Sequence, residues 1–255
     1  MAGEKEMKTE YFFRRGVFVF LVLVFLCGIV AAGAEDAAAV GSLVTFGHYE
    51  QDANENDGTE EIQWIVLDRD GDKALLLSKY GLDAKQYNTR YTKVTWETCT
   101  LRAWLNSTFL DAAFTAEEQE AILETEVDNS PEQGYEKWRS TNSGNNTVDR
   151  IFLLSYAEAN KYLGVTYENG ENVEARVSPT IYARARRAWS KRELLTADGD
   201  YAGRWWLRTP GRHPNRACHV HSTGALRDSH VTSNNYLFGV VAVRPALWVK
   251  VDALK

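Results

Sequence analysis

The stretch from residue 205 to 249 constrains the fold of this chain most strongly, because its two ends are apolar and its middle is polar. It begins with WWL and ends with the run GVVAVRPALWV, and both are typical of buried strands. Between them, alternating residues carry Arg, His and Asn side chains around a turn at 222–224. The pattern predicts a rigid sheet that presents a polar face to solvent.

Alternation within this stretch predicts which side chains point outward. Along CHVH, His219 and His221 should face solvent, while the Cys and Val should face the core. After the turn, Asp228 and His230 should also lie on an outward face. Of the two adjacent tryptophans at 205 and 206, one ring should be buried and the other should lie near the surface.

Charge sets this stretch apart from the rest of the chain. Residues 203–250 hold seven Lys and Arg against one Asp, a net charge of +6, whereas the whole chain carries −6 at pH 7. Four of the five histidines also lie here. A local basic patch on an acidic chain favours anionic ligands at that patch and excludes general nucleic-acid binding.

The first 34 residues are typical of a secretory signal peptide. Four basic residues precede an apolar run over 17–30, and small residues with an Ala-Gly-Ala pattern follow at 32–34. Cleavage is expected after Ala34, which leaves 25 basic and 32 acidic residues, a net charge of −7, on a secreted or cell-surface chain. The alternative is an uncleaved anchor, which would be the chain's sole contact with a membrane. A lipoprotein signal at Cys27 is disfavoured by the bulky Leu26 before it.

A linker over 35–42 leads into one α+β domain over 43–255, in which strands at both ends enclose short helices. The clearest element is a hairpin over 62–79 around an Asp-Gly turn. Arg184, Arg186 and Arg187 fit a solvated helix face better than a basic patch. The other expected elements are strands at 43–47 and 151–154, helices at 99–106, 116–124, 155–163 and from Ser178, and polar loops at 51–61 and 129–148.

Two cysteines remain after signal cleavage, Cys99 and Cys218. They could form a disulfide in an oxidising compartment, but their apolar surroundings favour two buried thiols. A thiolate–imidazole pair of Cys218 with His219 is disfavoured, because neighbouring residues on a strand point to opposite faces. The chain also lacks the G-x-S-x-G and H-E-x-x-H motifs and a phosphate-binding glycine loop. We therefore expect no catalytic residue.

Two groups of residues have some features of a metal site. His219, His221 and His230 could bind zinc, but no second acidic partner accompanies Asp228. The Asp and Asn spacing over 52–58 is only weakly similar to a calcium loop. The histidines are better interpreted as part of a binding face, so we expect neither a metal nor a cofactor.

The motif WWLRTPG, an irregular polar run and the closing GVVAVRPALWV together resemble the C-terminal signature of bacterial DUF6273-type domains. Such domains are similar to the variable proteins of diversity-generating retroelements, which have a C-type-lectin-like fold related to formylglycine-generating enzymes. The upstream stretches WIVL, ALLLSK and WETCTLRAWLN also resemble this domain. The resemblance therefore covers roughly residues 43–251.

This resemblance implies a single C-type-lectin-like, formylglycine-generating-enzyme-like domain with a variable region at 205–247. In such variable proteins the diversified residues lie on the solvent face and bind ligands. Oxidase chemistry is not implied, because formylglycine-generating enzymes use paired cysteines and this stretch has only Cys218. Carried over by position, the ligand-binding residues are Arg212, His213, Asn215, Arg216, His219, His221, Arg227, Asp228, His230, Asn234, Asn235 and Tyr236.

The first functional hypothesis is an exported module that displays this polar face to a protein or glycan ligand. Arg208 and Arg244 would be structural, paired with carboxylates beneath the sheet. Two alternatives stay open. One is a secreted enzyme of the formylglycine-generating type or a metal-dependent hydrolase, and the other is a cell-envelope structural protein without a discrete ligand.

Overall fold

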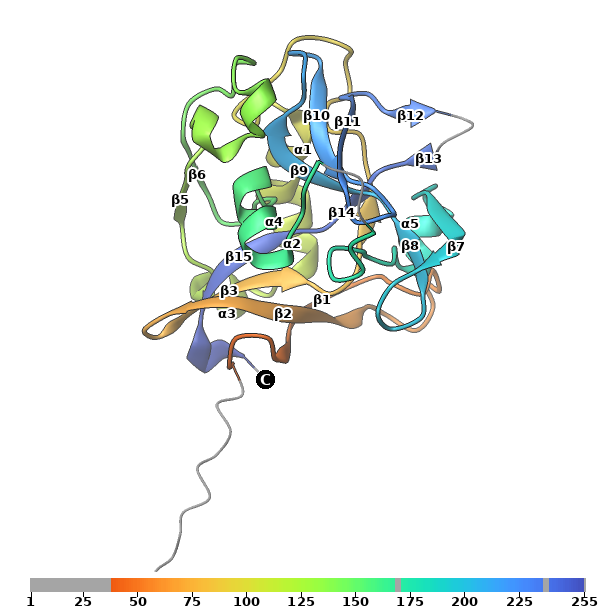
Figure 1. Ribbon diagram of the computed structural model, residues 1–255. Coiled ribbons are helices and arrows are strands. Elements are labelled where there is room, and N and C mark those ends of the chain that lie inside the picture. Colours follow the sequence, from red (N-terminus) through yellow and green to blue (C-terminus); the bar gives the residue numbers. More distant parts are fainter. Residues whose placement is uncertain (1–37, 168–170, 236–238, 255) are drawn as a thin grey trace, which may run out of the picture. The chain divides into compact units, whose positions relative to one another are not determined.

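Strands from both ends of the domain lie in one antiparallel sheet, at the bottom of the view in Figure 1. The computed structural model describes residues 38–167, 171–235 and 239–254, all within the unit Glu35–Lys255. Its β2 and β3 form the predicted hairpin, with Gly71 at a φ of 61° in the turn. The order along this sheet is β1 (Leu43–Tyr49), β2 (Glu60–Asp70), β3 (Lys73–Ser78) and β15 (Ala246–Lys250).

A second sheet carries the long C-terminal stretch (Figure 1). Its pairs are antiparallel except for β9 and β14, which run parallel. The order along it is β11 (Leu226–His230), β10 (Arg216–Val220), β9 (Trp205–Pro210), β14 (Ala242–Val243) and β4 (Asp83–Ala84). Three two-stranded ribbons accompany the two sheets: β5 (Thr125–Val127) with β6 (Thr147–Asp149), β7 (Ser190–Leu195) with β8 (Tyr201–Gly203), and β12 (Asn234–Asn235) with β13 (Gly239–Val240).

The helices are short, and those expected at 116–124 and 155–163 begin with capping boxes. Thr115 and Glu118 cap α3, and Ser155 and Glu158 cap α4. The helix expected at 99–106 continues to residue 113 through a π-helical turn. The α-helices are α1 (Thr100–Trp104), α2 (Leu110–Ala113), α3 (Ala116–Ala121), α4 (Tyr156–Leu163) and α5 (Ile181–Ala185), with helical turns at η1 (Leu105–Phe109), η2 (Pro131–Gln133), η3 (Glu136–Trp138) and η4 (Val251–Ala253).

Two expectations about local structure are wrong. Helix α5 begins at Ile181 with Thr180 as its N-cap, because the Thr180 hydroxyl accepts a hydrogen bond from the Ala183 amide. Residues 151–154 are buried but do not form a strand. They meet β15 through a single bridge between Phe152 and Ala246.

Trp205 and Trp206 are both fully buried, so the expectation that one ring lies near the surface is wrong. Their strand β9 is the central one of five, and both faces of the sheet are covered there. The indole of Trp205 donates to the carbonyl of Ala175 (3.0 Å), and that of Trp206 donates to the carbonyl of Lys85 (2.8 Å). Each ring therefore buries its apolar surface and satisfies its N–H group.

The domain is of the α+β class, as predicted, with more strand than helix. Among residues 38–167, 171–235 and 239–254, no helix is long and apolar enough to cross a membrane. The expected signal peptide over 1–34 lies outside the described residues, as do residues 35–37 of the linker.

Candidate ligand-binding face

The register of the β10–β11 hairpin divides the predicted ligand-binding residues between two faces. Cys218 lies opposite Asp228, and His219 lies opposite Arg227. Directly opposed residues project to the same side of a sheet, so Asp228 shares a face with Cys218 and not with His219. His230 lies two residues beyond Asp228 and shares its face. The prediction of one common outward face is therefore wrong.

His219 is inside the protein, contrary to the prediction. Its side chain is 3% exposed and packs edge-to-face on Trp206, its cross-strand partner, with ring centroids 6.0 Å apart. Burial, reinforced by nearby Arg204, holds the pKa of His219 well below its usual range. His221 is half-buried, and the same two causes lower its pKa to about 4. Both rings are neutral at pH 7, because covered strand faces disfavour the charged form.

Asp228 is also buried, with 1% of its side chain exposed, and two arginines converge on it. Arg216 Nε donates to Asp228 Oδ2 (2.8 Å), and Arg212 donates both its amide (3.0 Å) and its Nε (3.2 Å) to the same oxygen. Burial opposes ionisation, but the hydrogen bonds from Arg216 and the Arg212 amide hold the pKa of Asp228 below its usual value. Asp228 therefore fixes two guanidinium groups and is not itself a surface contact.

The position of Gly211, directly before Arg212, leaves no room for a side chain. A Cβ built there would lie 2.7 Å from Asp228 Cβ and 2.7 Å from its Oδ2. The close approach lets the Arg212 amide reach the carboxylate. A glycine at 211 directly before Arg212 therefore allows the ion pairs around buried Asp228 to form.

The other predicted residues vary in exposure. Those at the 211–215 loop and the end of β11 are the most accessible. The side chains of Asn234 and Asn235 in β12, and the whole of Tyr236, lie outside what the structure describes. Exposed residues are Arg212, His213 and His230, and half-buried residues are Asn215, Arg216 and Arg227.

Sequence reasoning missed an aromatic cluster beside these arginines, formed by Tyr135, Trp138, Tyr156 and Tyr167. Tyr135 and Tyr167 stack with ring centroids 4.9 Å apart, and Trp138 meets each of them edge-on at 5.1 and 5.3 Å. Tyr135, Tyr156 and Tyr167 also line a pocket of about 330 Å³. A signal was present in the sequence, because Tyr135 and Trp138 interrupt an otherwise polar, glycine-rich loop.

Two arginines join the aromatic cluster to the hairpin. The guanidinium carbon of Arg212 lies 5.4 Å from the Trp138 ring centroid, and that of Arg227 lies 5.5 Å from the Tyr167 ring centroid. Arg227 also donates to the Tyr167 carbonyl (3.2 Å). Arg216 joins this group through Asp228, which also holds Arg212, and the register puts Arg227 on the other side of the hairpin from Arg216. We name this connected group, formed by Arg212, Arg216, Arg227 and the aromatic cluster, the arginine–aromatic face.

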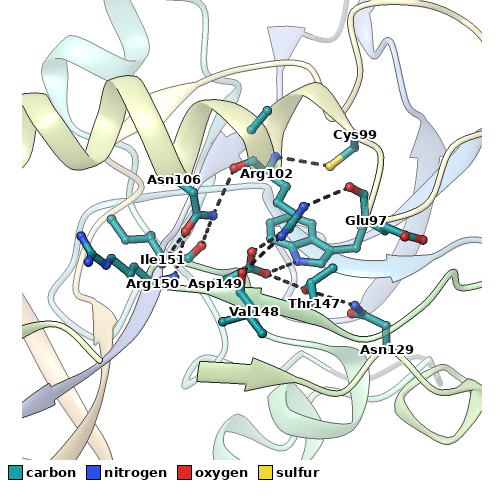
Figure 2. Close-up of polar contacts among 12 residues, drawn as sticks. Glu97, Cys99, Arg102, Asn106, Asn129, Thr147, Val148, Asp149, Arg150 and Ile151 are labelled. Atoms are coloured by element: carbon teal, nitrogen blue, oxygen red, sulfur yellow. Dashed lines mark hydrogen bonds and ion pairs between the residues drawn. The ribbon is translucent and has the colours of Figure 1, made fainter. Parts of the chain in front are cut away.

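A buried cluster of hydrogen bonds around Asp149 fixes both ends of the 129–148 loop, which carries Tyr135 and Trp138. In Figure 2 the side chains of Arg102 from α1 and Thr147 from β6 point toward the carboxylate of Asp149, whose side chain is fully buried. Asp149 accepts from Arg102 Nε (2.6 Å), from the Thr147 hydroxyl (2.7 Å) and from the Trp96 indole (2.9 Å). Asn129, at the other end of the loop, donates to the Thr147 hydroxyl (3.3 Å). These bonds hold both ends of the loop against α1.

Cys99 and Cys218 are buried free thiols, as the apolar pattern predicted. Burial raises the pKa of Cys99 and of Cys218 to about 12, and Cys218 Sγ donates to the Pro210 carbonyl (3.1 Å). A thiol with that pKa is protonated at neutral pH and is a poor nucleophile. Cys218 is therefore unsuited to thiolate chemistry.

The three histidines considered for zinc do not converge. The register puts His230 on the opposite face of the hairpin from His219, and His230 packs on the ring of Tyr91 at 5.1 Å. Among the described residues, the carboxylates of Glu50, Asp52 and Glu60 do lie within 4.8 Å of one another. These groups already accept backbone amide hydrogen bonds within the β1–β2 connection, as turn-capping residues do.

The model of the family described as "Domain of unknown function (DUF6273)" matches residues 71–251, a span that contains the arginine–aromatic face. The chain belongs to this family, as the resemblance predicted. No curated protein and no solved structure matches it.

Proposed function

We propose that the protein is an exported ligand-binding module whose arginine–aromatic face binds a protein or glycan ligand. The observation that carries this proposal is the position of Arg212. Its side chain is 46% exposed, yet its guanidinium is held by buried Asp228 on one side and lies over Trp138 on the other. A cation and an aromatic ring held in place before binding lose little entropy when a ligand arrives.

The composition of the face supports a binding role. Tyr, Trp and Arg are the residues enriched at interface hot spots and in antibody paratopes. The face combines three arginines with four aromatic rings beside a pocket, and Arg139 and Glu136 lie at the rim of that pocket. Its one buried acid is already neutralised by two arginines. We therefore propose that the ligand presents acidic groups to Arg212 and Arg227.

The proposed relation to the C-type-lectin-like fold is supported by topology. Strands from both ends of the domain share the sheet of β1, β2, β3 and β15, and the second sheet carries Arg216 and Arg227 of the face on its outermost hairpin. Such a division separates a scaffold from a recognition surface. We propose that residues of the hairpin region diversify on this scaffold, with the exception of His219 and Asp228, whose burial makes them structural.

Export is proposed from the N-terminal sequence alone. Basic residues, an apolar run and a small-residue cleavage pattern occur in that order before the domain. A ligand-binding face would then meet its ligand outside the cell or at its surface. Mass determination of the N-terminus of the chain recovered from the medium and from membranes tests cleavage after Ala34.

Ligand screening tests the binding proposal. The full chain is screened against arrays of glycans and of extracellular proteins, and each ligand found is titrated against Trp138→Ala and Arg212→Ala variants. We expect both variants to weaken binding at least about 10-fold, as truncation of hot-spot residues does. Arg192→Ala is the matched control, since Arg192 is exposed on β7 and outside the face. The proposal fails if no ligand binds, or if ligands bind both face variants as tightly as the unchanged chain.

A further inference from the structure

A second pocket shares no residue with the arginine–aromatic face. It has a volume of about 460 Å³, within the range of small-molecule sites, and is built from segments that are distant in the sequence. Its walls come from the chain around β4, from α1, from the end of α5 and from β13. The residues that give it chemical character are Lys85, Gln86, Thr100, Trp104, Arg186 and Arg187.

Every ionisable side chain in the lining of this pocket is a cation. Lys85, Arg186 and Arg187 supply three positive charges, and no acidic residue lines the pocket. Asp83 lies behind them with 1% of its side chain exposed and pairs with Arg186 (2.8 Å) and Lys85 (3.7 Å). The three cations of the lining and Asp83 behind them have a summed formal charge of +2, on a chain whose net charge is −6.

An aromatic side chain gives the pocket an apolar wall. Trp104 is half-buried, packs against the ring of Phe109 at 5.3 Å and carries the Lys85 ammonium 4.3 Å from its ring centroid. Leu101 and Val240 add further apolar surface. The pocket thus offers a ligand both hydrophobic contact and charge.

The backbone conformation at Arg187 is a second, independent argument that this side chain has a role in the pocket. Arg187 has a φ of 76°, at the position after the C-cap of α5, where glycine is the usual residue. Its amide donates to the Arg184 carbonyl (2.8 Å) and its carbonyl accepts from the Val240 amide (2.8 Å), so this conformation is held from both sides. A non-glycine residue there costs about 1 kcal/mol or more. Glycine would satisfy the turn without that cost, so the helix end does not account for the arginine side chain.

We propose that this pocket binds a small organic dianion, a phosphate ester or a dicarboxylate whose apolar part contacts Trp104. Arg186 and Arg187 would face the anionic group, because the planar guanidinium matches carboxylate and phosphate oxygens in pairs. The sequence alone favours a solvated helix face for these arginines. Their convergence with Lys85 and Trp104 around one pocket favours a binding role.

Calorimetric titration of the full chain tests the proposal, with phenyl phosphate and phthalate as organic dianions and inorganic phosphate and phenol as partial mimics. We expect at least one organic dianion to bind at least about 10-fold more tightly than either mimic, since charge and apolar contact both contribute. Arg187→Gly should weaken that binding at least about 10-fold while the chain stays folded, because glycine suits the backbone. Lys85→Gln is the second variant and should also weaken binding.

Arg184→Gln is the matched control, because Arg184 is exposed on the same helix but does not line the pocket. The affinity of the Arg184→Gln variant for the dianion should equal that of the unchanged chain. The proposal is overturned if neither dianion binds, if inorganic phosphate or phenol binds as tightly as the dianions, or if Arg187→Gly and Lys85→Gln bind as well as Arg184→Gln. Thermal melting of each variant separates loss of binding from loss of fold.

Discussion

Buried Arg208 and half-buried Glu158 form a two-point ion pair, with both guanidinium Nη atoms donating to the carboxylate. Arg208 is 1% exposed and also donates to the carbonyls of Leu153 and Asp128, both at 2.9 Å. The prediction of a structural Arg208 paired with a carboxylate is confirmed. Arg244 differs, because its Nε donates to the Ser78 carbonyl (2.9 Å) and its guanidinium lies over Trp205. Within the described part of the chain, no carboxylate pairs with Arg244, contrary to the expectation.

Removal of the Glu158 charge should destabilise the domain strongly. Glu158→Gln keeps a side chain that can cap α4 but leaves the buried Arg208 cation without its counter-charge, a change that typically costs about 3–5 kcal/mol. Urea unfolding followed by tryptophan fluorescence measures the loss. Glu120→Gln, on the exposed face of α3, is the control and should change stability by less than about 0.5 kcal/mol. Equal stability of the two variants would show that the buried pair is energetically neutral.

Local chemistry made much of the fold predictable. The Asp-Gly turn at 70–71 and the capping boxes at Thr115 and Ser155 depend on residues close in sequence, and each element begins or turns where expected. The α5 start was misplaced because Ser178 and Thr180 are both competent N-caps, and packing of the 178–180 segment against residues 81–82 selects Thr180.

The candidate face was harder to predict because it depends on register and on long-range packing. Alternation correctly put Cys218 and His219 on opposite sides of β10, but it does not tell which side is covered. His219 is buried because Trp206 of the neighbouring strand packs against it. Trp138 lies far from Arg212 in the sequence, and no local pattern relates the two. Only the folded loop, fixed by Asp149, brings them together.

Gly211→Ala should disturb the arginine–aromatic face at its base. The new Cβ would meet Asp228 Cβ at 2.7 Å, and both atoms belong to stiff parts of the structure, so Asp228 or the 211–212 backbone must shift. We expect a loss of about 1–3 kcal/mol in the free energy of unfolding, as for other overpacked sites. We also expect weaker ligand binding, since Asp228 holds Arg212. Unfolding curves check the first effect and the titrations above check the second. Gly199→Ala, where a Cβ has open space but φ is 86°, controls for backbone strain without a clash.

Cys99 and Cys218 should resist alkylation in the folded protein. Burial raises both thiol pKa values to about 12, so iodoacetamide at pH 8 meets buried, protonated sulfur. Mass spectrometry should find both residues unmodified under native conditions and both modified in urea. Replacement of Cys218 by Ala should leave ligand binding unchanged within about 2-fold, because the side chain is fully buried and cannot touch a ligand. Rapid native alkylation of Cys218, or loss of function in the Ala variant, would instead favour an enzyme of the thiol-dependent type.

Acid should destabilise the domain through His219 and His221. Burial lowers both pKa values in the folded state, so the unfolded chain takes up protons near pH 6.5 while the folded chain does not. Their contribution to stability is therefore complete above pH 6.5 and declines as the pH falls toward the lowered folded values. From pH 7 to 5 we expect a loss of about 1–2 kcal/mol in the free energy of unfolding, allowing for solvent screening of half-buried His221.

Urea unfolding at both pH values measures this loss. It should shrink in a His219→Gln, His221→Gln double variant and persist in His213→Gln, whose side chain is exposed. An unchanged pH dependence in the double variant would show that other groups cause the acid sensitivity.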